Sequence, residues 1–75
     1  MAKTFSGKET IKILCRSFGF YFVSQRGSHV KLRKQVVGRT VTTIVPLYKE
    51  LTRGTLFGIL ELAEVNEEVF LESAK

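Results

Sequence analysis

The sequence has one cysteine, one histidine and no long apolar run. These absences argue against disulfide-stabilised, metal-binding and membrane-spanning proteins. Its single cysteine, Cys15, has no partner for an intramolecular disulfide, and one cysteine with one histidine cannot supply the usual ligands of a metal site. No apolar stretch approaches the ~18 residues of a membrane-spanning helix, and none resembles a secretory signal. We therefore expect a cytoplasmic protein that uses no metal, cofactor or membrane segment, with Cys15 as a small core side chain.

Acidic residues are scarce in the first part of the chain. Residues 1–53 hold eleven Lys or Arg against two Glu, a net charge of +9, whereas residues 54–75 hold one Lys against five Glu, a net charge of −4. Together they give the chain its net charge of +5. A positive surface of this kind attracts nucleic acid in a salt-dependent way. The alternative is a solvated basic face that keeps a small protein soluble.

The length of 75 residues predicts one domain that spans residues 1–75. A chain of this size buries only roughly 60% of its unfolded surface, which leaves no room for a deep enclosed pocket. With 44% hydrophobic residues and six phenylalanines it still has enough apolar side chains for a thin packed layer. We therefore expect its chemistry on an open face.

Local signals predict the order of the elements. Ser6 and Glu9 have the spacing of a capping box, so a helix should begin there, and Gly19 is suited to end it. Three strands are expected next: one at 20–25, one from residue 29, and one at 39–45 that is stopped by Pro46. A connector at 26–28 and a turn at 34–38 join them. A second helix is expected to open at Thr52 or Gly54, and a short helix is expected from Asn66.

This order predicts an α+β fold with a three-stranded antiparallel sheet, two helices on one face of the sheet and a short C-terminal helix. Alternation in the second strand turns Val30 and Leu32 toward the helices and His29 away from them. Alternation in the first strand favours Phe20 and Phe22 as core residues.

The single histidine lies in a short run that is suited to act on a phosphodiester. Histidine has an unperturbed pKa of about 6.5 and can exchange a proton near neutrality, so His29 is the candidate catalytic residue. Its neighbours in sequence are candidate hydrogen-bond donors to the phosphate, namely Arg26, Lys31 and the backbone amides of Gly27 and Ser28. The alternative is a polar hairpin turn followed by a solvated strand face.

The neighbouring residues leave several roles open. His29 could act as a neutral base, with water, Lys31 or Tyr48 helping the leaving oxygen, or as a protonated acid. Tyr48 could stack on a base, donate its phenolic proton or cap the edge of the core. Cations farther along the chain are candidates for contacts with the nucleic-acid backbone: Arg33, Arg39 and Lys49.

The element order is that of the double-stranded-RNA-binding fold, and the motifs are more specific than the order. The chain resembles HicA-type toxins, also described as YcfA-like mRNA interferases. The resemblance covers nearly the entire chain and rests on these segments: Ser6-Gly7-Lys8-Glu9, Gly19-Phe20, Gln25-Arg26-Gly27-Ser28-His29, Val45-Pro46, Lys49-Glu50-Leu51, Gly54-Thr55-Leu56 and Ile59-Leu60.

The resemblance implies the toxin of a type II toxin–antitoxin system, a metal-independent endoribonuclease that cleaves mRNA until a HicB-type antitoxin covers it. The catalytic histidine of the family corresponds to His29. Where the family commonly carries a second histidine in a Pro-x-His pattern, this sequence has Pro46-Leu47-Tyr48. Two alternatives are a non-catalytic RNA-binding module and a weakened toxin that acts mainly by binding its antitoxin.

Overall fold

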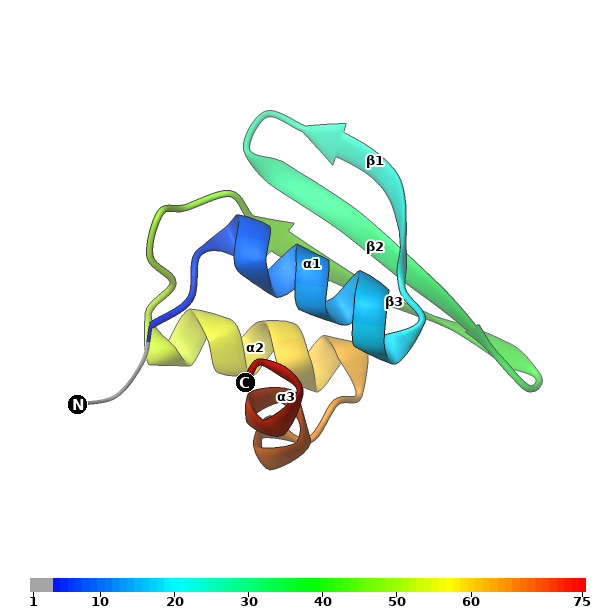
Figure 1. The fold of residues 1–75 in the computed structure, drawn as a ribbon. Helices are drawn as coiled ribbons and strands as arrows, with labels where there is room; N and C mark the ends of the chain where they lie inside the picture. The colour runs from blue at the N-terminus through cyan, green and yellow to red at the C-terminus, as the bar shows by residue number, and fades with distance from the viewer. Residues whose placement is uncertain (1–3) are drawn as a thin grey trace.

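The computed structural model describes residues 4–75, and its elements follow the expected order (Figure 1). They are α1 (Gly7–Phe18), β1 (Tyr21–Arg26), β2 (His29–Val36), β3 (Arg39–Pro46), α2 (Arg53–Ala63) and α3 (Glu67–Ser73). The three strands form one antiparallel sheet in the order β1-β2-β3. The predicted α+β class, with its three-stranded sheet and flanking helices, is confirmed.

The predicted helix caps are present. The Ser6 hydroxyl accepts from the Glu9 amide at 3.0 Å, and the Glu9 carboxylate accepts from the Ser6 amide at 3.0 Å. Gly19 ends α1 in the left-handed conformation, with φ 77°. Thr52 and Asn66 cap α2 and α3 by accepting hydrogen bonds from amides in the first turn of each helix. These contacts satisfy amide groups that a helix start otherwise leaves unpaired.

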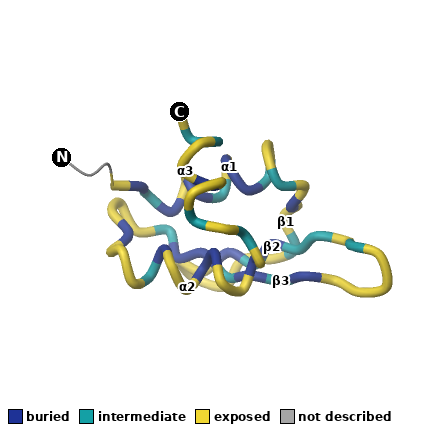
Figure 2. Tube along the Cα trace, turned by 90° about the horizontal axis from the view of Figure 1, so that it is seen from below, coloured by how far each residue is buried: buried dark blue, intermediate teal, exposed yellow. Residues whose placement is uncertain are grey.

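Both long helices cover the same face of the sheet. Val30 and Leu32 of β2 are 3% and 0% exposed and pack against apolar side chains of α1 and α2. Figure 2 shows the buried residues along the facing parts of α1, α2 and β3, whereas the end of the β2–β3 hairpin is exposed. The buried Thr43 hydroxyl joins the two layers because it donates to the Ile59 carbonyl at 2.8 Å. In the described part of the chain, no helix lies on the opposite face of the sheet.

The short α3 completes the core on the helix side. Its Phe70 is fully buried, and its ring lies 5.3 Å from that of Phe5 and 6.4 Å from that of Phe18, between ring centroids. Cys15 of α1 packs against the same core, as expected, and burial raises the pKa of its thiol. A raised pKa disfavours the thiolate, so Cys15 is a packing residue. Among residues 4–75, no helix combines the length and apolar character needed to cross a membrane.

Two local predictions are wrong. The turn expected at 34–38 is shorter, because β2 continues to Val36 and only Val37 and Gly38 form the turn. No residue suited to a turn precedes Gly38 in this stretch, and Lys34 keeps its place in the ladder with its ammonium group 5.1 Å from the Phe20 ring centroid. The expected core residue Phe22 is 58% exposed, while Phe20 is 4% exposed.

The exposure of Phe22 follows from the geometry of β1. This strand lies at the edge of the sheet, and its pairing with β2 shifts by one residue between Phe22 and Ser24. This bulge places Phe22 on the helix side with its partner Leu32, where regular alternation from Ser24 would turn it outward. The helices pack mainly on β3, so an edge-strand side chain on the helix side of the sheet can stay exposed.

The first residue of α1, Gly7, lies directly against the backbone that leaves β3. A Cβ on Gly7 would overlap the Pro46 carbonyl oxygen and lie 2.9 Å from Cα of Leu47. The Gly7 amide donates to the Tyr48 carbonyl at 2.9 Å. Only glycine permits this close approach of helix and loop.

We predict that Gly7→Ala destabilises the protein, because backbone atoms have to move to admit the methyl group. The expected cost is about 1–3 kcal/mol or more in the free energy of unfolding. Gly58→Ala is the matched control, since a Cβ on Gly58 in α2 meets no atom within 4 Å. It should stabilise the helix by about 0.5–1 kcal/mol. Urea denaturation measures both changes, and equal midpoints for the two variants would contradict the close contact.

Candidate functional site

The face of the sheet opposite the helices, called here the outer face, carries the predicted site. Val30 and Leu32 point into the core, so the alternate residues of β2 point outward. His29 is exposed, and Lys31 and Arg33 are partly exposed. Strand pairing places further side chains on this face, namely Tyr21, Ser24 and Arg26 of β1, Gln35 of β2, and Thr42 and Ile44 of β3.

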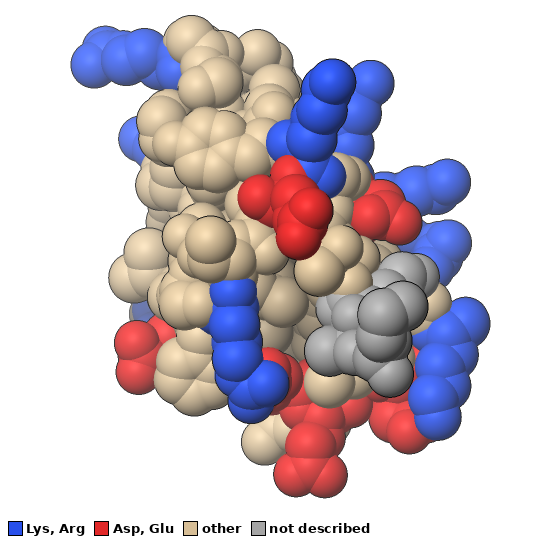
Figure 3. Space-filling view, turned by 90° about the vertical axis from the view of Figure 1, so that its left-hand side faces the viewer, with Lys and Arg blue, Asp and Glu red and all other residues tan. Residues whose placement is uncertain are grey.

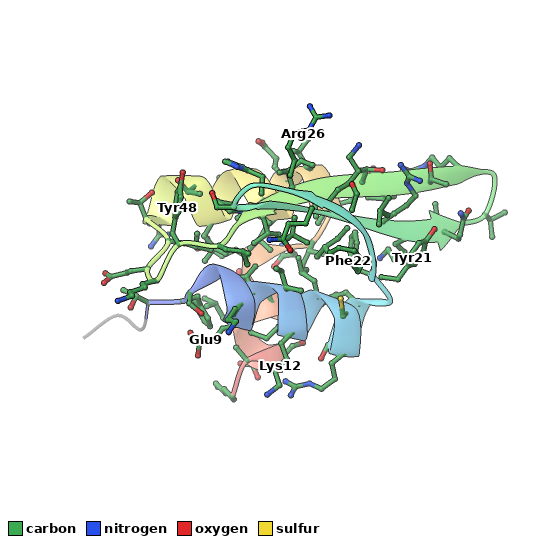
Figure 4. The ribbon with its side chains drawn as sticks, turned by 90° about the horizontal axis from the view of Figure 1, so that it is seen from above. Glu9, Lys12, Tyr21, Phe22, Arg26 and Tyr48 are labelled. Carbon is green, nitrogen blue, oxygen red and sulfur yellow. The ribbon has the colours of Figure 1, made fainter. Side chains whose placement is uncertain are left out.

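The strand register brings Arg26 and His29 together. These two residues are direct partners across β1 and β2, and Ser24 is the partner of Lys31. Figure 4 shows Arg26 pointing away from the helix α1 and from its side chains Glu9 and Lys12. A guanidinium group and an imidazole therefore stand side by side on the open surface.

A shallow cavity of about 290 Å³ lies between these side chains and is lined by Ser24, Arg26, His29, Lys31 and Ile44. The sequence analysis did not predict that Ser24 and Ile44 line this site. Their signal was the alternation of β3, where Val41, Thr43 and Val45 are buried and Ile44 therefore faces outward. For Ser24 the signal was weaker, because the bulge in β1 interrupts the alternation.

Tyr48 lies beside the imidazole. Its ring centroid is 6.4 Å from that of His29, at an interplanar angle of 77°. The side chain is 50% exposed and is not among those that pack against the core, so Tyr48 does not cap the core edge. In Figure 4 its side chain projects to the same side of the molecule as Arg26.

Backbone hydrogen bonds fix this neighbourhood. The Leu47 amide donates to the Ser28 carbonyl at 2.6 Å, and the Gly7 amide donates to the Tyr48 carbonyl at 2.9 Å. The loop after β3 is thereby tied to both the β1–β2 turn and the start of α1. These bonds place Tyr48 relative to His29 through backbone atoms.

The β1–β2 turn is open to solvent. Gly27 has φ 58°, and a Cβ there would meet no atom within 4 Å. The Gln25 side-chain amide donates to the Gly27 carbonyl at 3.0 Å and holds the turn closed. Gly27 and Ser28 are both exposed to solvent.

The remaining cations divide between the two faces. Arg33 lies on the outer face, where its Nε donates to the Thr42 hydroxyl at 3.3 Å. Arg39, an expected backbone contact, instead lies on the helix side and donates two hydrogen bonds, of 2.7 and 2.6 Å, to the Glu64 carboxylate. These bonds lower the pKa of the Glu64 carboxyl. Lys49 is exposed in the loop after β3.

The outer face has a positive charge that no carboxylate of the sheet offsets. The sequence contains no Asp or Glu between Glu9 and Glu50, so all three strands lack a negative side chain. In the view of Figure 3 most acidic side chains gather toward the bottom, on the side of α2 and α3, and the basic ones project mainly from the top and the sides. A one-signed surface of this kind attracts anions.

The site has the components for binding a phosphate and exchanging a proton. Arginine and lysine hold anionic oxygens, and an exposed imidazole can give or take a proton beside them. Within residues 4–75, no three His, Cys, Asp or Glu side chains form a group that could hold a metal ion.

The fold and the outer face together define a small α+β protein with one open, positively charged sheet face that carries an imidazole. A family model described as HicA toxin of bacterial toxin-antitoxin matches residues 7–65, which include His29, Tyr48 and most of the elements. The chain belongs to this family, and membership supports a toxin role and implies an antitoxin partner. No curated protein matches the chain.

Proposed function

We propose that this HicA-family toxin is an endoribonuclease that cleaves mRNA in the cytoplasm without a metal ion. The observation that carries the proposal is the exposed His29, paired with Arg26 across the sheet and next to Lys31 on a face without carboxylates. We further propose that a HicB-type antitoxin inhibits the enzyme by covering the outer face.

The proposed reaction needs two proton transfers. The ribose 2′-oxygen loses a proton and attacks the adjacent phosphorus, and the bond from phosphorus to the 5′-oxygen breaks as that oxygen gains a proton. A 2′,3′-cyclic phosphate and a free 5′-hydroxyl result. His29 carries out one of these transfers as general base or general acid, a role typically worth 10²–10⁴-fold in rate.

The other groups of the site hold the phosphate in position and stabilise its negative charge. Arg26 and Lys31 line the same cavity as His29 and would hold the phosphate oxygens as negative charge builds on them. The exposed turn of Gly27 and Ser28 offers backbone amides nearby. Tyr48 lies close enough to His29 to serve as the second proton-transfer group, in the loop where the family commonly has a histidine.

We predict that cleavage depends on His29. Purified protein should cleave single-stranded RNA in the presence of EDTA, and His29→Ala should lower the rate by about 10²–10⁴-fold because the proton carrier is lost. RNA affinity should persist, since the cations remain. An all-deoxy strand of the same sequence should stay intact because it lacks the attacking hydroxyl.

The alternatives give different results in the same assay. Tight binding of intact RNA by the unaltered protein would identify a non-catalytic binding module. Capture of an antitoxin at equal stoichiometry, without growth arrest when the toxin alone is expressed, would identify a protein that acts mainly by binding its partner. Undiminished cleavage by His29→Ala would show that the site lies elsewhere.

We predict that Tyr48 also contributes to cleavage. Tyr48→Phe keeps the ring beside His29 but removes the hydroxyl, so the cleavage rate should fall by about 10²-fold if the phenol transfers a proton. Tyr48→His should retain more activity than Tyr48→Phe, because an imidazole can take over the transfer. Single-turnover cleavage rates measure both. Equal rates for Tyr48→Phe and the parent protein would remove Tyr48 from the reaction.

The salt dependence of RNA binding should distinguish cations of the outer face from those on the helix side. Each cation that contacts a phosphate of single-stranded nucleic acid contributes about 0.7 to the slope of log affinity against log salt concentration. Arg33→Gln should therefore reduce this slope by about 0.7. Arg39→Gln is the matched control, because Arg39 is on the helix side and bonded to Glu64. Equal losses for the two variants would contradict binding at the outer face.

A further inference from the structure

The bulge in β1 determines which aromatic side chain of this strand shares the outer face with His29. Ser24 and Arg26 point outward, so regular alternation would turn Phe22 outward as well. The pairing shift between Phe22 and Ser24 inserts one residue, and Tyr21 pairs with Arg33 while Phe22 pairs with the buried Leu32. Bulges commonly re-aim side chains in this way beside functional sites.

Tyr21 is therefore an aromatic residue on an open, basic sheet face. Its side chain is 44% exposed and is not part of the hydrophobic core. The Gln35 side-chain amide donates to the Tyr21 hydroxyl at 3.4 Å, and Arg33 is its direct partner on β2. The hydrogen bond from Gln35 thus holds the phenol on a face that no helix of residues 4–75 covers.

We propose that Tyr21 forms a subsite in which one base of single-stranded RNA stacks on the phenol ring. An exposed aromatic ring on an open sheet, flanked by cations, is the arrangement by which small sheet proteins bind unpaired bases. Arg33 and Lys31 supply the phosphate contacts between this ring and His29. The proposal rests on the proposed binding of RNA to the outer face and adds a specific position to it.

The subsite lies away from the reacting phosphate. Arg33, the partner of Tyr21, lies four positions after His29 on β2, which corresponds to roughly 13 Å along the strand. At the spacing of stacked nucleotides this distance spans roughly four nucleotides, and fewer if the RNA is extended. In Figure 4 Tyr21 and Tyr48 lie apart from one another, with Arg26 between them in this view. The stacked base thus belongs to a flanking nucleotide and not to the cleaved linkage.

Binding measurements test the subsite independently of cleavage. The His29→Ala protein is titrated with a fluorescent single-stranded RNA of about a dozen mixed nucleotides. Adding Tyr21→Ala should weaken binding by about 5-fold to 150-fold, which corresponds to ~1–3 kcal/mol per stacked base. Tyr21→Phe should bind nearly as well as the parent, because it keeps the ring. Thermal unfolding of each variant verifies that it is folded.

Phe22→Ala is the matched control, since it removes a similarly exposed ring from the same strand but from the helix side. It should leave RNA affinity unchanged. Equal losses for Tyr21→Ala and Phe22→Ala, or no loss for Tyr21→Ala, would overturn the stacking subsite while leaving the cleavage proposal standing. Failure of the unaltered protein to bind RNA at all would overturn both.

A second measurement locates the base. RNAs with a single abasic nucleotide, moved one position at a time, are bound to the His29→Ala protein. One position, a few nucleotides from the cleaved linkage mapped with the unaltered protein, should show weakened binding, and Tyr21→Ala should abolish that sensitivity. An abasic effect of the same size in the Tyr21→Ala background would assign the stacking to another residue.

Discussion

The close approach of Gly7 to the backbone of Pro46 and Leu47 is the constraint on which the site depends. It lets the first turn of α1 lie against the end of β3, and the Gly7 amide then fixes the Tyr48 carbonyl. The same loop is bonded to the Ser28 carbonyl at the other side. The start of a core helix thus determines where the loop beside His29 lies. A change in the packing of α1 is expected to reach the site through backbone atoms.

Most of the fold could be predicted from the sequence because its local signals agree with one another. The capping box at Ser6, the glycine at Gly19 and the caps at Thr52 and Asn66 each lie where the structure has a helix end. Period-two alternation in β2 was enough to place His29 outward and Val30 inward. These features depend on residues close in sequence, which is why they can be predicted from it.

The errors arise where the environment is set by residues far away in sequence. Phe22 faces the helix side like its partner Leu32, but β1 is the edge strand and the helices pack mainly on β3, so its ring stays exposed. The turn begins later than the composition predicts, because Lys34 and Gln35 are polar like a loop but pair with β3 as part of the strand. The proximity of Tyr48 to His29 has no local signal, since it depends on loop bonds to α1 and to the β1–β2 turn.

Charge is sorted between the two sides of the molecule as well as along the chain. On the helix side, Arg39 is bonded to Glu64 and Lys34 lies over the Phe20 ring, so these cations have partners within the fold. Because the pKa of Glu64 is lowered, this ion pair is present at neutral pH and is lost only as pH falls through the lowered value. The cations of the outer face have no carboxylate on the sheet. The positive potential is therefore concentrated on the face that carries the imidazole.

An open face has consequences for both catalysis and control. Water is not excluded around His29, so catalysis there would depend on position and on fixed positive charge instead of on a dry pocket. A partner that covers the outer face would remove the imidazole, the phosphate contacts and the aromatic ring from solution together. Such inhibition requires no rearrangement of the sheet, whose pairing and bulge already hold these groups in place. The shallow site and the proposed inhibition by covering it would therefore both follow from the same small fold.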